Sequence, residues 1–95
     1  MSTPTTLTSK QRKDLKARAH HLKPVIQVGQ HGISEAVIKE TNLALDTHEL
    51  IKVQIQQGER DQRLLDAQAL ASATHAELVH HIGKIFILYR QKQDV

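Results

Sequence analysis

The chain has 95 residues, of which 39% are hydrophobic and 24% are charged, and its formal net charge is +3. This length supports one domain with one core, and the composition is that of a globular chain. The absence of cysteine excludes disulfides, thiolate metal ligands and a cysteine nucleophile. Neither an apolar stretch of about 20 residues nor the apolar core of a signal peptide is present, so we expect a cytoplasmic protein.

The chain begins with a polar, threonine-rich segment, residues 1–7, which we expect to be a flexible leader. Thr8 and Gln11 have the spacing of a capping box, in which each side chain accepts a hydrogen bond from the other residue's backbone N–H. This predicts a helix over residues 9–22, which ends before Pro24 because a residue preceding proline resists helical geometry. Beside the apolar side of this helix runs a cationic stripe: Arg12, Lys16 and His20, with Lys13 adjoining.

A strand and a second helix are predicted next. Residues 25–28 are few and β-branched, which favours a strand. A Gly-x-x-Gly turn follows at residues 29–32, and Ser34 then has the position of the N-cap of a helix that continues to about residue 48. Residues 50–56 alternate between apolar and polar side chains, which predicts a second strand with one apolar face.

The remaining chain predicts one more helix and a hairpin. An alanine-rich segment, 61–74, indicates a third helix, and residues 77–82 and 84–90 are expected to pair across Gly83. The last strand is apolar on both faces, which places it inside the sheet. The order α-β-α-β-α-β-β over one domain, residues 8–92, predicts an α/β fold (α+β by some schemes) in which three helices cover a four-stranded mixed sheet with right-handed crossovers.

The net positive charge lies in the first part of the chain, up to the end of the glycine turn. Residues 1–32 carry six basic side chains against one acid, Asp14, whereas residues 33–95 carry seven basic and nine acidic side chains. A polarised basic patch is typical of a protein that binds a polyanion, most commonly a nucleic acid. The stripe could instead be a solvated helix face, but its like charges have little local compensation, which favours the polyanion.

The glycine turn joins a strand to a helix N-terminus, where unpaired N–H groups and the helix dipole favour phosphate. Gly29 and Gly32 would let a ligand approach the backbone closely, although a turn that needs positive φ also explains such a pair. His31 could donate to phosphate or simply be a solvated loop residue. The turn is therefore a candidate phosphate site with a structural alternative.

No metal site, cofactor or catalytic centre is predicted. The pairs His20-His21 and His80-His81 diverge too far to chelate, and the chain has no His-x-x-x-His spacing. Nucleophile-elbow, Walker and dinucleotide patterns are also missing. Because only Phe86 and Tyr89 are aromatic, a stacking platform for single-stranded bases is not expected, and recognition should depend on backbone shape and charge.

Several sequence blocks, in the right order, resemble the CRM domain (chloroplast RNA splicing and ribosome maturation). The blocks are LTSKQR at 7–12, AHHLKPVIQVGQHGI at 19–33, ELIKV at 49–53, IGK at 82–84 and LYR at 88–90. The resemblance implies RNA binding, association with precursors of the large ribosomal subunit, and a fold akin to the C-terminal domain of the third bacterial translation initiation factor. That family often carries lysine directly after the first glycine, where this chain has Gln30. His31, Lys23 and the cationic stripe must then supply more of the charge.

The leading hypothesis is an RNA-binding module that assists assembly of the large ribosomal subunit by holding structured ribosomal RNA, without a membrane or small-molecule partner. Its expected RNA contacts are Gly29, Gln30, His31, Gly32, Lys23, Arg12, Lys13, Lys16 and His20. One alternative is an adaptor whose more acidic C-terminal two-thirds docks a basic ribosomal protein, with the glycine turn purely structural. Another is an enzyme that acts on a small phosphorylated metabolite.

Overall fold

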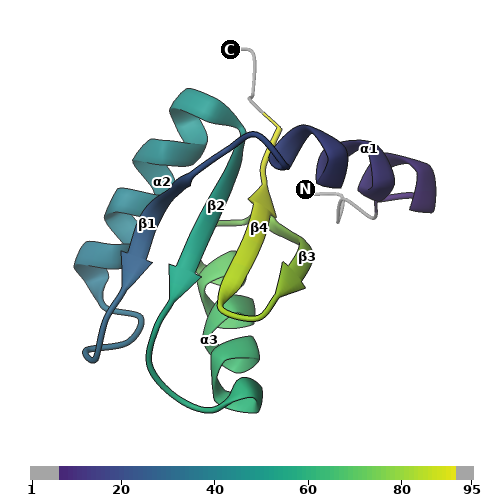
Figure 1. Cartoon of the computed structure of the whole chain (residues 1–95). Coiled ribbons are helices and arrows are strands. Elements are labelled where there is room, and N and C mark those ends of the chain that lie inside the picture. Colours follow the sequence, from purple (N-terminus) through teal and green to yellow (C-terminus); the bar gives the residue numbers. More distant parts are fainter. Residues whose placement is uncertain (1–6, 92–95) are drawn as a thin grey trace.

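The computed structural model describes residues 7–91, so the predicted leader residues 1–6 and residues 92–95 lie outside the described part. The elements follow the predicted order (Figure 1): α1 (Ser9–Ala19), β1 (Pro24–Val28), α2 (Glu35–His48), β2 (Leu50–Ile55), α3 (Arg60–Ala73), β3 (Glu77–Ile82) and β4 (Ile85–Tyr89). This order and the mixed sheet confirm the fold predicted from the sequence.

Local signals account for the helix boundaries. The capping box of α1 is formed, since Thr8 N donates to Gln11 Oε1 at 2.8 Å and Gln11 N donates to Thr8 Oγ1 at 3.1 Å. The helix ends at Ala19 rather than at the predicted Leu22, whose N–H donates to the Ala19 carbonyl in a turn that leads into β1. The restriction that Pro24 places on Lys23 keeps the helix from continuing to that residue, but it does not by itself set the end at Ala19.

The four strands form one sheet in the order β1-β2-β4-β3. β1 and β2 are parallel, whereas β4 is antiparallel to both β2 and β3. β4 therefore lies inside the sheet as predicted, and its central residues Phe86, Ile87 and Leu88 are all buried. β1 and β3 form the two edges.

The two faces of the sheet are covered unequally. On one face α2 and α3 enclose the larger core, to which Ile51, Val53 and Ile55 of β2 belong. On the other face α1 packs a smaller cluster through Leu15 and Ala19. Successive strand residues point to opposite faces of the sheet. The strand residues that do not face α2 and α3 therefore either contact α1 or face solvent.

Leu7 belongs to the smaller cluster. Its side chain is only 7% exposed and lies in the same cluster as Leu15 and Leu50. The packed domain therefore includes Leu7, which the sequence assigned to the leader, because its apolar side chain closes the edge of the α1 core.

Arg90 connects the carboxyl ends of three elements. From the end of β4, its Nη1 donates to Asn42 Oδ1 at 2.8 Å and to the Thr74 carbonyl at 2.7 Å, and its Nη2 donates to Asp46 Oδ1 at 2.7 Å. These bonds tie β4 to α2 and to the end of α3. The arginine of the LYR block therefore stabilises the packing of α2 and α3 on the sheet.

Candidate nucleic-acid interface

The face of the sheet on which α1 packs is called the open face below, because α1 covers it only in part, and two cross-strand rows of this face lie beside the helix. In one row Lys52 of β2 and His80 of β3 flank Ile87 of β4, and in the next row Gln54 and Ile82 flank Ile85. Gln27 of β1 extends the second row through its pairing with Gln54. Cross-strand partners point to the same face, so these side chains share the surface beside α1.

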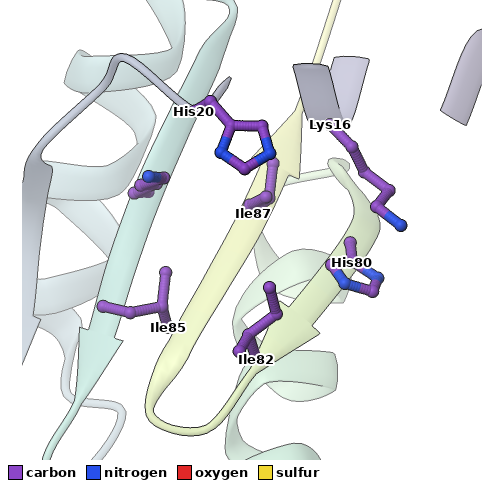
Figure 2. A pocket seen from close by; sticks show the side chains of 7 residues that line it. Lys16, His20, His80, Ile82, Ile85 and Ile87 are labelled. Atoms are coloured by element: carbon purple, nitrogen blue, oxygen red, sulfur yellow. The ribbon is translucent and has the colours of Figure 1, made fainter. Parts of the chain in front are cut away.

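A hollow of about 210 Å³ lies between α1 and the open face. Its lining comes from α1 and its C-cap residue and from β2, β3 and β4 (Figure 2): Lys16, His20, Lys52, His80, Ile82, Ile85 and Ile87. We call it the α1 pocket. Three isoleucines form its floor, two lysines and two histidines form its rim, and none of the lining residues is acidic. Such a rim offers uncompensated positive charge beside an apolar surface.

His80 lies at the pocket rim beside other basic side chains. The pKa of His80 is lowered from its ordinary value by partial burial first and then by the neighbouring charges of Lys16 and His81. An anion in the α1 pocket would oppose the last two effects, because it would favour the protonated ring. A bound anion and the protonated form of His80 would therefore favour each other.

Arg12 is placed differently from the rest of the cationic stripe. Its half-buried guanidinium donates through Nη1 to the carbonyl oxygens of Leu78 and Val79, both at 3.0 Å. These carbonyls lie at the irregularity of β3, where the pairing with β4 shifts between Leu78 and His80. Arg12 therefore fastens α1 to the sheet, while Lys13 and Lys16 stay exposed to solvent.

The glycine turn follows β1 at the other end of that strand from α1 (Figure 1). Within the turn, Gly32 N donates to the Gly29 carbonyl and Ser34 N donates to the Gly32 carbonyl, both at 3.1 Å. Gln30 and His31 at the tip are exposed. Ser34 caps α2 as predicted, since its hydroxyl oxygen accepts from Val37 N at 3.2 Å.

The two glycines of the turn have different structural requirements. Gly32 has φ +66°, which a residue with a side chain rarely adopts. Gly29 lacks positive φ, and a Cβ built on it would meet no heavy atom within 4 Å. The fold therefore requires glycine at 32 and not at 29. A close approach by a ligand would explain the glycine at position 29.

The predicted contacts fall into two groups rather than one. Lys16 and His20 lie at the α1 pocket, whereas Gly29, Gln30, His31 and Gly32 lie beyond the far end of β1. Lys23 precedes β1, and the five residues of that strand separate it from the turn by about 17 Å.

Sequence reasoning missed Lys52 and His80. The alternation within residues 50–56 already showed Lys52 on the face opposite the apolar one, but it could not show that α1 would lie beside it. His80 had no usable signal, because the irregularity in β3 changes the alternation of that strand.

The described part of the chain shows neither a cluster of metal-ligating side chains nor a helix that could span a membrane. Among residues 7–91, no three histidine, aspartate or glutamate side chains gather in a way that could hold a metal ion. None of the helices within that range is long and apolar enough to cross a membrane.

Together, the fold and this surface define a small α/β domain with one mixed sheet, a cationic helix edge and a glycine turn. The model of the CRS1 / YhbY (CRM) domain matches residues 7–90. The chain therefore belongs to the CRM domain family, as its sequence blocks indicated.

Bacterial relatives match over nearly the whole chain. A Haemophilus influenzae protein named RNA-binding protein is 42% identical over 90 residues, which cover 95% of this chain and 91% of that protein. The probable RNA-binding protein YqeI of Bacillus subtilis is 38% identical, with 93% of this chain and 92% of the relative covered. The solution structure of the hypothetical protein SAV1595 from Staphylococcus aureus superposes with a TM-score of 0.82 at 38% identity, over 94% of this chain and 93% of that one.

Proposed function

We propose that this protein binds structured RNA, that its target is ribosomal RNA in precursors of the large ribosomal subunit, and that it assists assembly of that subunit in the cytoplasm. One observation carries the proposal: the rim of the α1 pocket gathers Lys16, Lys52, His20 and His80 with no acidic residue among its lining side chains. The names of the bacterial relatives support RNA as the polyanion. The resemblance to the CRM domain supports the ribosomal target.

The surface suits recognition of an RNA backbone. Lysine side chains neutralise phosphates and release condensed counterions, which supplies affinity that is independent of sequence. The N–H groups of the glycine turn would contact the backbone a second time, beyond the end of β1 and apart from the α1 pocket. Two separate contacts favour a structured RNA whose shape presents phosphates to both. The protein acts in this proposal by binding and holding RNA rather than by catalysis.

The test combines identification of the RNA with a salt titration. Crosslinking in cells, followed by sequencing of the attached RNA, should enrich large-subunit ribosomal RNA and its precursors. Binding of the purified protein to an enriched fragment should weaken steeply with salt, since each phosphate contact contributes a log–log slope of about −0.7 to −0.9. Enrichment of other RNA alone would overturn the ribosomal target, and a slope near zero would overturn the electrostatic contact.

An adaptor remains the alternative, and the outer helix surfaces favour it in one respect. Leu43 on α2 and Leu65 on α3 are 59% and 58% exposed, on helices that pack against the other face of the sheet. Such groups could contact a protein partner. Association with ribosomal particles that survives nuclease treatment would support the adaptor, whereas its loss on nuclease treatment would support RNA binding.

A further inference from the structure

We propose that the α1 pocket receives one unpaired nucleobase of the bound RNA, with the phosphates on either side of that nucleotide held by Lys16 and Lys52. The inference rests on the proposed function and adds a specific site to it. It also changes the expected mode of recognition, because a base in a pocket is read in addition to the shape of the backbone.

Part of the pocket floor is apolar surface that the fold leaves uncovered. Ile82 is 66% exposed although it lies directly across from Ile85 in the sheet, and Ile85 is itself only half-buried. Ile87 continues this surface beneath α1, where it is buried. Contiguous exposed apolar side chains with a polar rim are typical of a binding site, because covering them removes apolar surface from water.

The size of the pocket limits what can occupy it. Its volume of about 210 Å³ is below the range of about 300–1,000 Å³ that encloses a drug-sized ligand. One flat ring system fits this limit, whereas a whole dinucleotide or an amphipathic helix does not. The rim charges then call for an anionic group attached to the ring, which a nucleotide within RNA provides.

The two histidines supply flat ring surfaces at the rim of the pocket. Phe86 is 2% exposed and lies in the larger core, so its ring is not accessible to RNA. Figure 2 shows the His20 ring reaching from α1 over the sheet and the His80 ring standing near Lys16. Imidazole rings stack on bases as other aromatic side chains do. A base lying on the isoleucines would therefore meet a ring on either side.

Only an unpaired base can use this arrangement. In an A-form helix the bases are stacked and paired, and the deep, narrow major groove does not admit side chains. A bulged or looped-out nucleotide presents a free ring with a phosphate on each side. Lys16 on α1 and Lys52 on β2 line the pocket from different elements, so each can take one of these phosphates.

The test compares two RNA hairpins that differ only in one unpaired uridine placed in the middle of the stem. Fluorescence anisotropy gives the affinity of the full chain for each, and the readout is their ratio. The wild-type protein should prefer the bulged hairpin about fivefold or more, which is the lower end of what stacking of one base contributes. The ratio is insensitive to contacts that both hairpins share.

Two matched variants test whether the preference for the bulged hairpin depends on the α1 pocket. Ile82→Asn should reduce the ratio to about one, and the exposure of Ile82 makes a folded variant expected. Val25→Asn makes the same kind of change at a 51% exposed strand position outside the pocket lining, and should keep the ratio of the wild type. A photocrosslink from 5-bromouridine at the bulge should fall on peptides that contain His20, Lys52 or His80.

The outcomes separate this inference from the proposed function. Equal affinity of the wild type for both hairpins, an unchanged ratio in folded Ile82→Asn, or crosslinks confined to residues 29–32 would overturn the base pocket while leaving RNA binding in place. Failure to bind either hairpin or any ribosomal fragment would overturn the proposed function and the pocket with it.

Discussion

Arg12 Nη1 donates to the carbonyl oxygen of Val79 at 3.0 Å across a separation of 67 residues. This bond, with its partner to Leu78, holds α1 against the irregular part of β3. Because Lys16 lies on the same helix and His20 is its C-cap residue, the bond also sets where these two side chains meet the open face. Arg12 thus contributes to the candidate site by positioning α1.

Replacing Arg12 tests this positioning role. Arg12→Gln should lower the free energy of unfolding by about 1–2 kcal/mol, because it removes hydrogen bonds from a charged donor to two carbonyls. Thermal unfolding should show the loss as a decrease in Tm of roughly 4–8 °C per kcal/mol. The matched variant Lys13→Gln, at an exposed position one residue along α1, should leave Tm unchanged. An equal Tm for both variants would contradict the role of Arg12.

The exposed lysines of α1 should govern the salt dependence of RNA binding. Replacing Lys13 and Lys16 together with Gln should flatten the log–log salt slope by about 1.5, at 0.7 to 0.9 for each lost phosphate contact. Both side chains are exposed, so the free energy of unfolding should stay nearly constant. The double variant Lys39→Gln, Arg60→Gln, on α2 and α3, should keep the slope of the wild type. A slope that falls equally in both double variants would place the RNA elsewhere.

Substitutions of the two glycines of the turn should differ in their effects on stability and on RNA binding. Gly32→Ala should lower the free energy of unfolding by about 1 kcal/mol or more, because alanine is strained at φ +66°. Gly29→Ala should leave stability unchanged or slightly higher, and should weaken RNA binding if the backbone approaches phosphate there. Tm and RNA affinity measured on both variants check this difference. Unchanged affinity of Gly29→Ala would favour a purely structural turn.

Charge at the tip of the turn provides a stronger test. Replacing Gln30 and His31 with Asp, while Gly29 and Gly32 are kept, should weaken RNA binding at least tenfold, or about 1.4 kcal/mol, through like-charge repulsion. Tm should hold or rise slightly, because the carboxylates lie near the N-terminus of α2. Normal RNA affinity of the folded double variant would show that the turn is not a contact surface, and the adaptor would then lead.

The lowered pKa of His80 predicts opposite effects of acid on the free protein and on its complex. The unfolded chain binds a proton at this group more readily than the folded chain. Protonation of His80 therefore lowers the free energy of unfolding. This free energy is highest above the ordinary pKa of about 6.5 and decreases as the pH falls through that value toward the lower folded pKa. RNA binding should instead strengthen over this range, because phosphate favours the protonated ring.

Tm and RNA affinity at pH 7.5 and pH 5.5 measure both effects. His80→Gln should reduce the pH dependence of each, while His48→Gln, an exposed change at the end of α2, should leave both as in the wild type. Binding that weakens on acidification would argue against phosphate beside His80.

The sequence by itself determined the features that depend on neighbouring residues. Thr8 and Gln11 lie three positions apart, so their reciprocal bonds and the start of α1 follow from local geometry. The same holds for Ser34 at the start of α2 and for the strand periodicity that puts Lys52 opposite the apolar face. Hydrogen bonds and side-chain directions within a few residues need no knowledge of the rest of the chain.

Only the tertiary structure decided which of these surfaces meet. The insertion of β4 between β2 and β3 brings Ile85 and Ile87 beside Lys52 and His80. The irregularity in β3 supplies the carbonyls that hold Arg12 and thereby orient α1. These pairings depend on long-range packing that no local pattern specifies. For this reason the sequence indicated a basic helix and a glycine turn, whereas the pocket between α1 and the sheet emerged only from the packed domain.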